Sequence, residues 1–230
     1  MRITWLGHSA FELQCDGGEV LVLDPWIEGN PAYPKGHGIQ RVDAIAISHG
    51  HFDHINDVVP LAKRFKPQVV AIFEIASWLQ TKGVEHTTGM NKGGTVDLGF
   101  VKLTMTHALH SGAIKDGSQL IYGGEAAGYV ITLKDGRRVY FAGDTTVFGD
   151  MTLIREIYQP ELAFLPIGDL FTMGPHEAAH AARLLQVKKV VPMHWGTFPA
   201  LTGRPEQLAE RLQKDGIEVW TLKQGEPVDW

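Results

Sequence analysis

The chain has 230 residues, of which 44% are hydrophobic and 20% charged, a composition typical of a globular protein with one large domain or two small ones. Its net charge of −5 leaves no basic surface for a nucleic-acid backbone, and no apolar run approaches the length of about 20 residues that a membrane-spanning helix needs. One cysteine, Cys15, excludes an internal disulfide, and the amino terminus begins a strand rather than a signal peptide. We therefore expect a cytoplasmic protein that binds neither nucleic acid nor membrane.

Short strands separated by turn signals make up the first part of the chain. We predict them at residues 3–6, 10–14 and 20–23, because each is apolar and bounded by Gly or by Asp-Gly-Gly. His8 lies in the turn between the first two strands. Asp24 ends the third strand, since the next residue is a proline, which cannot donate a hydrogen bond to a sheet.

Four candidate metal ligands follow the next predicted strand, residues 42–47, within six residues: His49, His51, Asp53 and His54. The two histidines at 49 and 51 project to the same side of an extended backbone, so both can reach one cation. We expect Asp53 and His54, which follow as the loop folds over, to face a second cation. A polar loop with exposed histidines is the alternative, but four ligand-type side chains this dense at a strand end are typical of a metal site.

Helices and strands alternate over the rest of the chain. Asn56 and Asp57 are typical helix caps. Helices are predicted at residues 58–65, 74–82, 150–158, 175–185 and 204–214. Strands are predicted at residues 68–72, 95–98, 101–106, 129–133, 138–141, 162–167, 190–192 and 217–222, with a loose, glycine-rich segment at 112–128. Strands followed by β-α units occur twice, before and after about residue 120, which predicts two similar halves of a single domain over residues 1–230, with sheets inside and helices outside.

A ligand-type residue follows four of these strands at the carboxyl end, where α/β sheets build their sites. These residues are His49, His110, Asp144 and His194. Together with His51, Asp53 and His54 they make seven candidate metal ligands, about the number that two cations need. Alone, Asp144 could be a turn residue and His194 a core histidine, so it is the complete set that favours a ligand role. His107 lies near the same strand end as His110 and competes with it.

The order of these residues resembles the metallo-β-lactamase superfamily: His49-x-His51-x-Asp53-His54, then a lone His, then Gly143-Asp144-Thr145, then a late His. Residues 5–9, 24–26, 168–175 and 192–195 further resemble small metal-dependent hydrolases related to ascorbate-phosphate lactonase. The resemblance covers essentially the whole chain. It implies an α/β fold, the four-layer αβ/βα sandwich, in which two mixed β-sheets face each other and the site lies at one edge. Phe52 stands where one common family pattern has Gly, a position that supplies no ligand atom.

The resemblance also implies a role for each candidate. One metal ion is expected to be held by His49, His51 and His110, the other by Asp53, His54 and His194, and both by a bridging Asp144. Asp53 and Asp144 are also the candidate catalytic carboxylates. We expect Asp24 to orient ligand histidines, with an ordinary Asp-Pro turn as the alternative, and His8 to support the site, contact substrate or lie on the surface. The metal is expected to be zinc, although His/Asp sites also accept Mn, Fe or Ni.

These residues predict a metal-dependent hydrolase in which a hydroxide bridging two metal ions cleaves a small ester, lactone or phosphoester. No Gly-x-Ser-x-Gly motif is present, and Cys15 ends a strand-like run, residues 11–15, with no feature that would lower its pKa, so no serine or cysteine nucleophile is expected. Two alternatives stay open. One is a di-iron redox protein, and the other is a non-nuclease metal-binding sensor module. The sequence allows a homo-oligomer.

Three loops are expected to shape the pocket for a small-molecule substrate. The Gly- and Pro-rich loops at 27–41 and 112–128 should form its rim, and the loop at 168–174 should overhang the metals. The helix predicted to begin at Pro175 would then direct free N–H groups toward the site, which favours a substrate that carries a carboxylate or phosphate.

Overall fold

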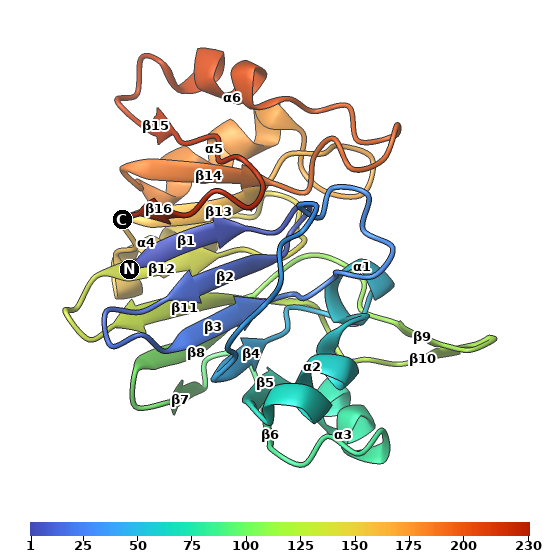
Figure 1. Cartoon of the computed structure of the whole chain (residues 1–230). Helices are drawn as coiled ribbons and strands as arrows, with labels where there is room; N and C mark the ends of the chain where they lie inside the picture. The colour runs from blue at the N-terminus through green and yellow to red at the C-terminus, as the bar shows by residue number, and fades with distance from the viewer.

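The structure, a computed structural model, describes all 230 residues. Two large β-sheets face each other, and helices lie on their outer sides (Figure 1). The first sheet contains, in spatial order, β16 (Val228–Asp229), β1 (Arg2–Trp5), β2 (Phe11–Gln14), β3 (Val20–Leu23), β4 (Ala44–Ala46), β5 (Gln68–Ile72) and β6 (Thr87–Met90). The second contains β15 (Glu218–Val219), β14 (Lys189–Met193), β13 (Leu162–Pro166), β12 (Arg138–Phe141), β11 (Ala127–Leu133), β8 (Val101–His107) and β7 (Thr95–Asp97). The predicted four-layer αβ/βα sandwich is confirmed.

Both sheets combine antiparallel and parallel pairing in the same way. Four strands pair antiparallel in each sheet, β16, β1, β2 and β3 in the first and β7, β8, β11 and β12 in the second, and the remaining strands pair parallel. Parallel neighbours need crossover connections, most of which are helices here. The helices are α1 (Phe52–Ile55), α2 (Val58–Phe65), α3 (Phe73–Thr81), α4 (Met151–Tyr158), α5 (Pro175–Leu185) and α6 (Pro205–Leu212). The chain therefore consists of two similar halves.

The border between the halves differs from the prediction. β7 and β8 already belong to the second sheet, so the halves meet before residue 95 and not near residue 120. The glycine-rich segment at 112–128 is not a border, because the strands before and after it, β8 and β11, pair with each other in one sheet. Their pairing runs from Val101 with Leu133 to His107 with Ala127. The predicted repeat is therefore present, but its border lies before residue 95, ahead of the glycine-rich segment.

Four further differences concern short elements. The loose segment at 112–128 contains a hairpin, β9 (Ile114–Asp116) and β10 (Gln119–Ile121), that projects from the body of the molecule (Figure 1). β6, β16 and α1 were not predicted either. β6 is polar and contains Gly89, β16 has two residues, and α1 is a single turn, so none of them shows a clear period. The other predicted elements are present, with ends shifted by three residues or fewer.

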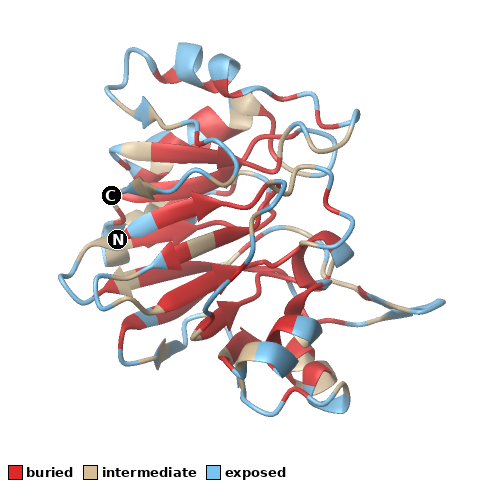
Figure 2. Cartoon of the chain, in the orientation of Figure 1, coloured by how far each residue is buried: buried red, intermediate tan, exposed pale blue.

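The core lies between the two sheets, and most strand residues are buried (Figure 2). All residues of β3, β4 and β13 are buried, as expected for central strands covered on both faces. Phe11 of the first sheet packs edge-on against Phe164 of the second, with ring centroids 4.7 Å apart, and also contacts Phe141. Aromatic rings from both sheets therefore hold the two halves together.

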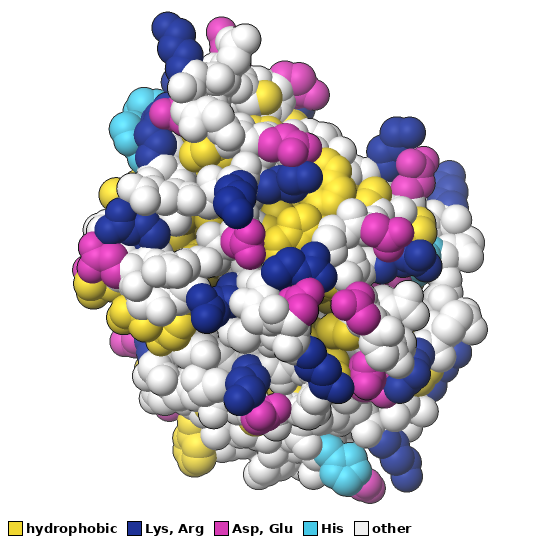
Figure 3. All heavy atoms as spheres, turned by 90° about the vertical axis from the view of Figure 1, so that its left-hand side faces the viewer, with side chains coloured by type: hydrophobic (Ala, Val, Ile, Leu, Met, Phe, Trp, Pro, Cys, Tyr) yellow, Lys and Arg dark blue, Asp and Glu magenta, His cyan; other side chains and the backbone are white.

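The two chain ends meet at one edge of the sandwich. The ammonium group of Met1 donates to the backbone oxygen of Trp230 at 3.1 Å and to Asp16 at 2.9 Å. Figure 3 views the molecule from this side and shows basic and acidic side chains interspersed, without one large patch of a single sign. Exposed ion pairs of this kind contribute little to stability.

Removal of the ring at the centre of the sheet interface should strongly destabilise the fold. We expect Phe164→Ala to lower the free energy of unfolding by about 3–5 kcal/mol, because the ring is fully buried and its loss leaves a cavity. Urea unfolding followed by circular dichroism measures the change. Phe73→Ala is the matched control: its ring is 63% exposed, so it should change stability by less than about 0.5 kcal/mol. Equal effects of the two substitutions would contradict this account of the core.

Candidate metal centre

Strand ends from both sheets meet at one edge and bring together all nine residues singled out from the sequence. His8 follows β1, Asp24 follows β3, and residues 49–54 follow β4. From the second sheet, His110 follows β8, Asp144 follows β12 and His194 follows β14. His107, the competitor of His110, instead lies on β8 itself, half-buried, with its Nδ1 3.0 Å from the Lys92 ammonium.

The ligand loop, residues 48–54, changes backbone conformation in its middle. His51 is extended, with φ −67° and ψ 150°, and α1 begins at the next residue. The helical turn gives Asp53 and His54 a different direction from His49 and His51, which divides the four ligands into two groups. A side chain at Gly50 would place its Cβ 2.6 Å from the backbone oxygen of Gly112, so the loop can pack here only without one.

The first group contains His49, His51 and His110. The Nδ1 atom of His51 lies 2.9 Å from the Nε2 of His49 and 3.3 Å from the Nε2 of His110. His49 is fully buried and the other two are half-buried. Three imidazole nitrogens from two sheets therefore converge on one point.

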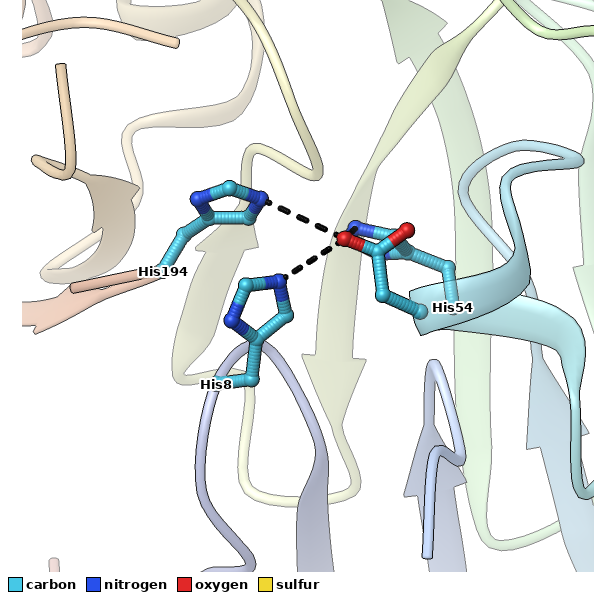
Figure 4. Close-up of side chains that lie close together, drawn as sticks. His8, His54 and His194 are labelled. Atoms are coloured by element: carbon cyan, nitrogen blue, oxygen red, sulfur yellow. Dashed lines mark hydrogen bonds and ion pairs between the residues drawn. The ribbon is translucent and has the colours of Figure 1, made fainter. Parts of the chain in front are cut away.

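The second group contains Asp53, His54, His194 and His8 (Figure 4). The Oδ2 atom of Asp53 lies 3.9 Å from the Nε2 of His54 and 3.8 Å from the Nε2 of His194. It lies 3.0 Å from the Nε2 of His8, within hydrogen-bond distance. The two halves of the fold thus contribute to this group as well.

Asp144 lies between the groups. Its Oδ2 atom is 3.1 Å from the Nε2 of His194 and 3.3 Å from that of His54, both in the second group. It is also 3.7 Å from the Nε2 of His110 and 3.9 Å from that of His49, both in the first. One carboxylate oxygen is therefore close to four imidazole nitrogens.

The residues present fit metal coordination in both groups. A tetrahedral cation at about 2.0–2.2 Å from its ligands holds them about 3.3–3.6 Å apart, and the spacings above, 2.9 to 3.9 Å, bracket that range. The Nε2 of His54 and the Oδ1 of Asp144 are buried without a hydrogen-bond partner. Buried polar atoms normally have one, so these atoms suit coordination.

Asp24 supports the second group from behind. Its carboxylate accepts hydrogen bonds from the backbone N–H and hydroxyl of Ser48 and lies 2.7 Å from the Nδ1 of His54. With Nδ1 held in this way, the Nε2 of His54 faces the ligand group. Burial raises the pKa of Asp24, while His54 and Ser48 act in the opposite direction. The side chain thus does more than close an Asp-Pro turn.

His8 is fully buried behind Asp53, so it has no surface for substrate. Burial, together with the neighbouring His194, lowers the pKa of His8 to about 4, and the ring is neutral near pH 7. A carboxylate can only accept, so the Nε2–H of His8 donates to Asp53, and its Nδ1 accepts from the hydroxyl of Thr197 at 3.0 Å. The contribution of Thr197 was not predicted; its only signal in the sequence is that it follows His194 by three residues.

Burial and the neighbouring carboxylates act in opposite directions on the pKa values of the site histidines. Burial alone would lower the pKa of His54, but the carboxylates of Asp144, Asp24 and Asp53 outweigh it and raise that pKa well above its ordinary value. Burial and the neighbouring His54 lower the pKa of His49 well below its ordinary value. A histidine binds a metal ion only in its neutral form, so a metal ion at His54 would compete with a proton.

A cavity of about 570 Å³ opens over the ligand groups. It is lined by His51, Phe52, Asp53, His110, Ser111, Asp144, Phe171, His194, Phe198 and Ala200. Its volume is typical of a small-molecule site. Another hollow, of about 640 Å³, lies near Arg138 and Gln159, and none of its lining residues belongs to a ligand group.

The loop at 168–174 contributes Phe171 to the cavity, as predicted. The loops at 27–41 and 112–128 contribute no lining residue, so the predicted rim is wrong. The first of these loops is instead held against the body, because Asp57 accepts hydrogen bonds from the backbone N–H groups of Ile27 and Glu28. For the same reason the Asp57 side chain does not cap α2.

None of the helices is long and apolar enough to cross a bilayer. Residues 20–195 match the sequence profile of the Beta-lactamase superfamily domain. A metal-dependent hydrolase of Solibacter usitatus is 64% identical over 230 residues, covering all of both chains, and one of Rubrobacter xylanophilus is 50% identical over 98% of this chain and 95% of the relative.

The chain belongs to the metallo-β-lactamase superfamily. The profile spans more than half of it, and the relatives match it over nearly their whole length. The structure of Igni18, a metallo hydrolase from Ignicoccus hospitalis, superposes with a TM-score of 0.86 at 33% identity, covering 99% of this chain and 97% of that one. The chain is thus a metal-dependent hydrolase of this superfamily.

Loss of the Asp24 carboxylate should weaken metal binding. We expect Asp24→Asn to lower metal affinity by about 10–100-fold, because the Nδ1 of His54 loses its charged partner. Competition with a chromophoric chelator measures the affinity, and unfolding of the metal-free variant shows separately whether the fold survives. Asp150→Asn, on the exposed surface, is the control. An affinity unchanged in folded Asp24→Asn would contradict the supporting role.

Cys15 should be unreactive and dispensable. Burial, with the charge of Glu19 adding to it, raises the pKa of its thiol to about 11, so only about one molecule in a thousand carries a thiolate at pH 8. Alkylation by iodoacetamide at pH 8 should be about 100-fold slower than for a small thiol and should accelerate as the pH rises toward 11. Rapid alkylation at pH 8, or loss of hydrolysis in Cys15→Ser, would reinstate a cysteine nucleophile.

Proposed function

We propose that this hydrolase binds two divalent metal ions, most simply zinc, and cleaves a small ester, lactone or phosphoester. The observation that carries the proposal is the position of Asp144, whose Oδ2 lies within 3.1–3.9 Å of four imidazole nitrogens from both ligand groups. A single cation would not need a carboxylate shared between two such groups.

Each residue receives a definite task in this proposal. His49, His51 and His110 would hold the first ion, Asp53, His54 and His194 would hold the second, and Asp144 would contribute to both. His8 and Asp24 hold Asp53 and His54 in place from behind. Such partners fix the orientation of the ligands and their tautomers.

Two ions held in this way would supply a hydroxide nucleophile at neutral pH and would polarise the scissile bond. The protein adds a site that is closed on one side and open on the other. His49, His54 and Asp144 are buried, whereas His51 and His110 are half-buried and line the cavity. Substrate therefore approaches from the cavity.

No other nucleophile competes for the role. The hydroxyl of Ser48 donates to Asp24, and Cys15 follows β2 outside the cavity. The hydroxyl of Ser111 lines the cavity but lies near a candidate ligand nitrogen, the Nε2 of His51 at 3.3 Å.

The proposal extends to the molecule as a whole. The chain acts as one domain over residues 1–230, because one cluster of 63 buried residues draws on both sheets. In this proposal its partner is a small-molecule substrate, and it binds neither nucleic acid nor membrane. It works in a reducing cytoplasm, and association into a homo-oligomer is compatible with this arrangement.

Reconstituted protein should contain two metal ions per chain by elemental analysis. His49→Ala should keep the fold, lose metal from the first group and abolish hydrolysis of a panel of lactones, thioesters and phosphodiesters. His86→Ala removes an exposed histidine and should change nothing.

Three results would contradict the proposal. Fewer than one metal ion per chain after reconstitution would remove the two-metal site. Coloured, iron-loaded protein that reduces oxygen without hydrolysing the panel would favour the di-iron redox protein. Two bound ions with no turnover of any kind would favour a sensor module.

A further inference from the structure

The cavity over the ligand groups has two unlike parts. Its floor consists of ligand-type residues: His51, Asp53, His110, Asp144 and His194. Above them stands an aromatic wall, which we define as Phe52, Phe171 and Phe198. The three rings come from α1, from the loop before α5 and from the loop after β14.

The aromatic wall exposes more apolar surface than folding requires. The side chains of Phe52 and Phe171 are 51% and 55% exposed, next to a cavity rather than scattered over the surface. Exposed apolar side chains that gather around one cavity, and are not scattered singly, indicate a binding site. Transfer of an apolar group onto it removes both surfaces from water.

A buried ring holds part of the wall in place. Trp26, only 3% exposed, packs edge-on against Phe52 with centroids 5.6 Å apart and lies 5.7 Å from Phe198. Its indole N–H donates to the backbone oxygen of Glu28 at 3.0 Å. Two of the three wall rings are thus backed by a fixed side chain, and no rearrangement is needed to form the surface.

The loop that carries Phe171 is fixed as well. Asp169 and Leu170 have positive φ angles of 69° and 49°, which non-glycine residues rarely adopt. The loop is tied to the site because the N–H of Met173 donates to the backbone oxygen of Thr145, next to Asp144. Strain that the surroundings maintain beside a site is consistent with a binding role for Phe171.

Nothing in the wall neutralises an anion. No Lys or Arg lines the cavity. The amino end of α5, where we expected a substrate carboxylate or phosphate, already has an acidic partner, because the N–H of Gly174 donates to the Glu177 carboxylate at 3.2 Å. The part of a substrate that reaches the wall therefore meets hydrocarbon and no counter-charge.

We propose that the substrate is a carboxylic ester or lactone whose acyl group carries an uncharged aryl or alkyl chain that packs on the aromatic wall. This inference rests on the proposed function, since it names the substrate of the same site. Water adds to the carbonyl carbon, the acyl–oxygen bond breaks, and the proton passes to the departing alkoxide. An ester gives a carboxylic acid and an alcohol, and a lactone gives a hydroxy acid.

Hydroxamic acids test the wall without turnover, because they bind metal ions through their own two oxygens. Calorimetric titration of metal-loaded protein compares acetohydroxamic acid, phenylacetohydroxamic acid and the monohydroxamate of succinic acid, which carries a carboxylate in place of the ring. We expect the phenyl compound to bind about 10–100-fold more tightly than the acetyl compound, and the succinyl compound to gain nothing.

Phe171→Ala should reduce the phenyl-to-acetyl affinity ratio by about three- to tenfold. Phe73→Ala is the matched control, because that ring is 63% exposed and does not line the cavity, so the ratio should stay unchanged. A ratio near one in the unaltered protein, or tightest binding of the succinyl compound, would overturn the proposal. So would an equal effect of the two substitutions.

Turnover separates this inference from the proposed function. The nitrophenyl esters of acetic and phenylacetic acid share a leaving group and differ only in the acyl group. Hydrolysis of both at equal kcat/KM would overturn the inference and leave the hydrolase function intact. Phenyl-selective hydroxamate binding without hydrolysis of any ester, lactone or phosphoester would support the apolar wall and overturn the proposed function.

Discussion

The burial of three carboxylates at one edge of the sandwich is the constraint on which the site depends. Asp24, Asp53 and Asp144 are each at most 9% exposed. An isolated buried charge is very unfavourable, so such groups are paired, hydrogen-bonded or bound to metal. The imidazoles around them satisfy part of this need, yet an oxygen of Asp144 and a nitrogen of His54 stay without hydrogen bonds. Bound metal would complete this compensation at the ligand groups.

The two-sheet architecture supplies what a single sheet could not. The first sheet delivers the ligand loop, and the second delivers His110, Asp144 and His194. The ligand groups therefore form only when the sheets pack, and the aromatic contacts of Phe11 with Phe141 and Phe164 maintain that packing. The packing of the core therefore also fixes the geometry of the site.

The sequence was most informative where residues of the site are close along the chain. The spacing of residues 49–54 and the strand before it were sufficient to place four ligands together. The choice between His107 and His110 depends on where β8 ends, which is set by its pairing with β11 as far as His107. The aromatic wall joins three distant segments, and Thr197 reaches His8 across 189 residues, so no local pattern could reveal them. Glycine and proline content predicted neither the hairpin of β9 and β10 nor the lining of the pocket.

Backbone strain shows where chemistry overrides local preference. Eight non-glycine residues have positive φ angles, and three of them, Lys66, Gln159 and Gln186, end helices, where this conformation is common. The other five are His8, Asp24, Asp169, Leu170 and His194, all at the site or in the loop that carries Phe171. Glycine would relieve the strain at each position, but at His8, Asp24 and His194 it would remove the imidazole or carboxylate that the site needs. The packed sheets must therefore hold these turns in an unfavourable conformation, and they do so where a strand end has to turn its side chain back toward the ligand groups.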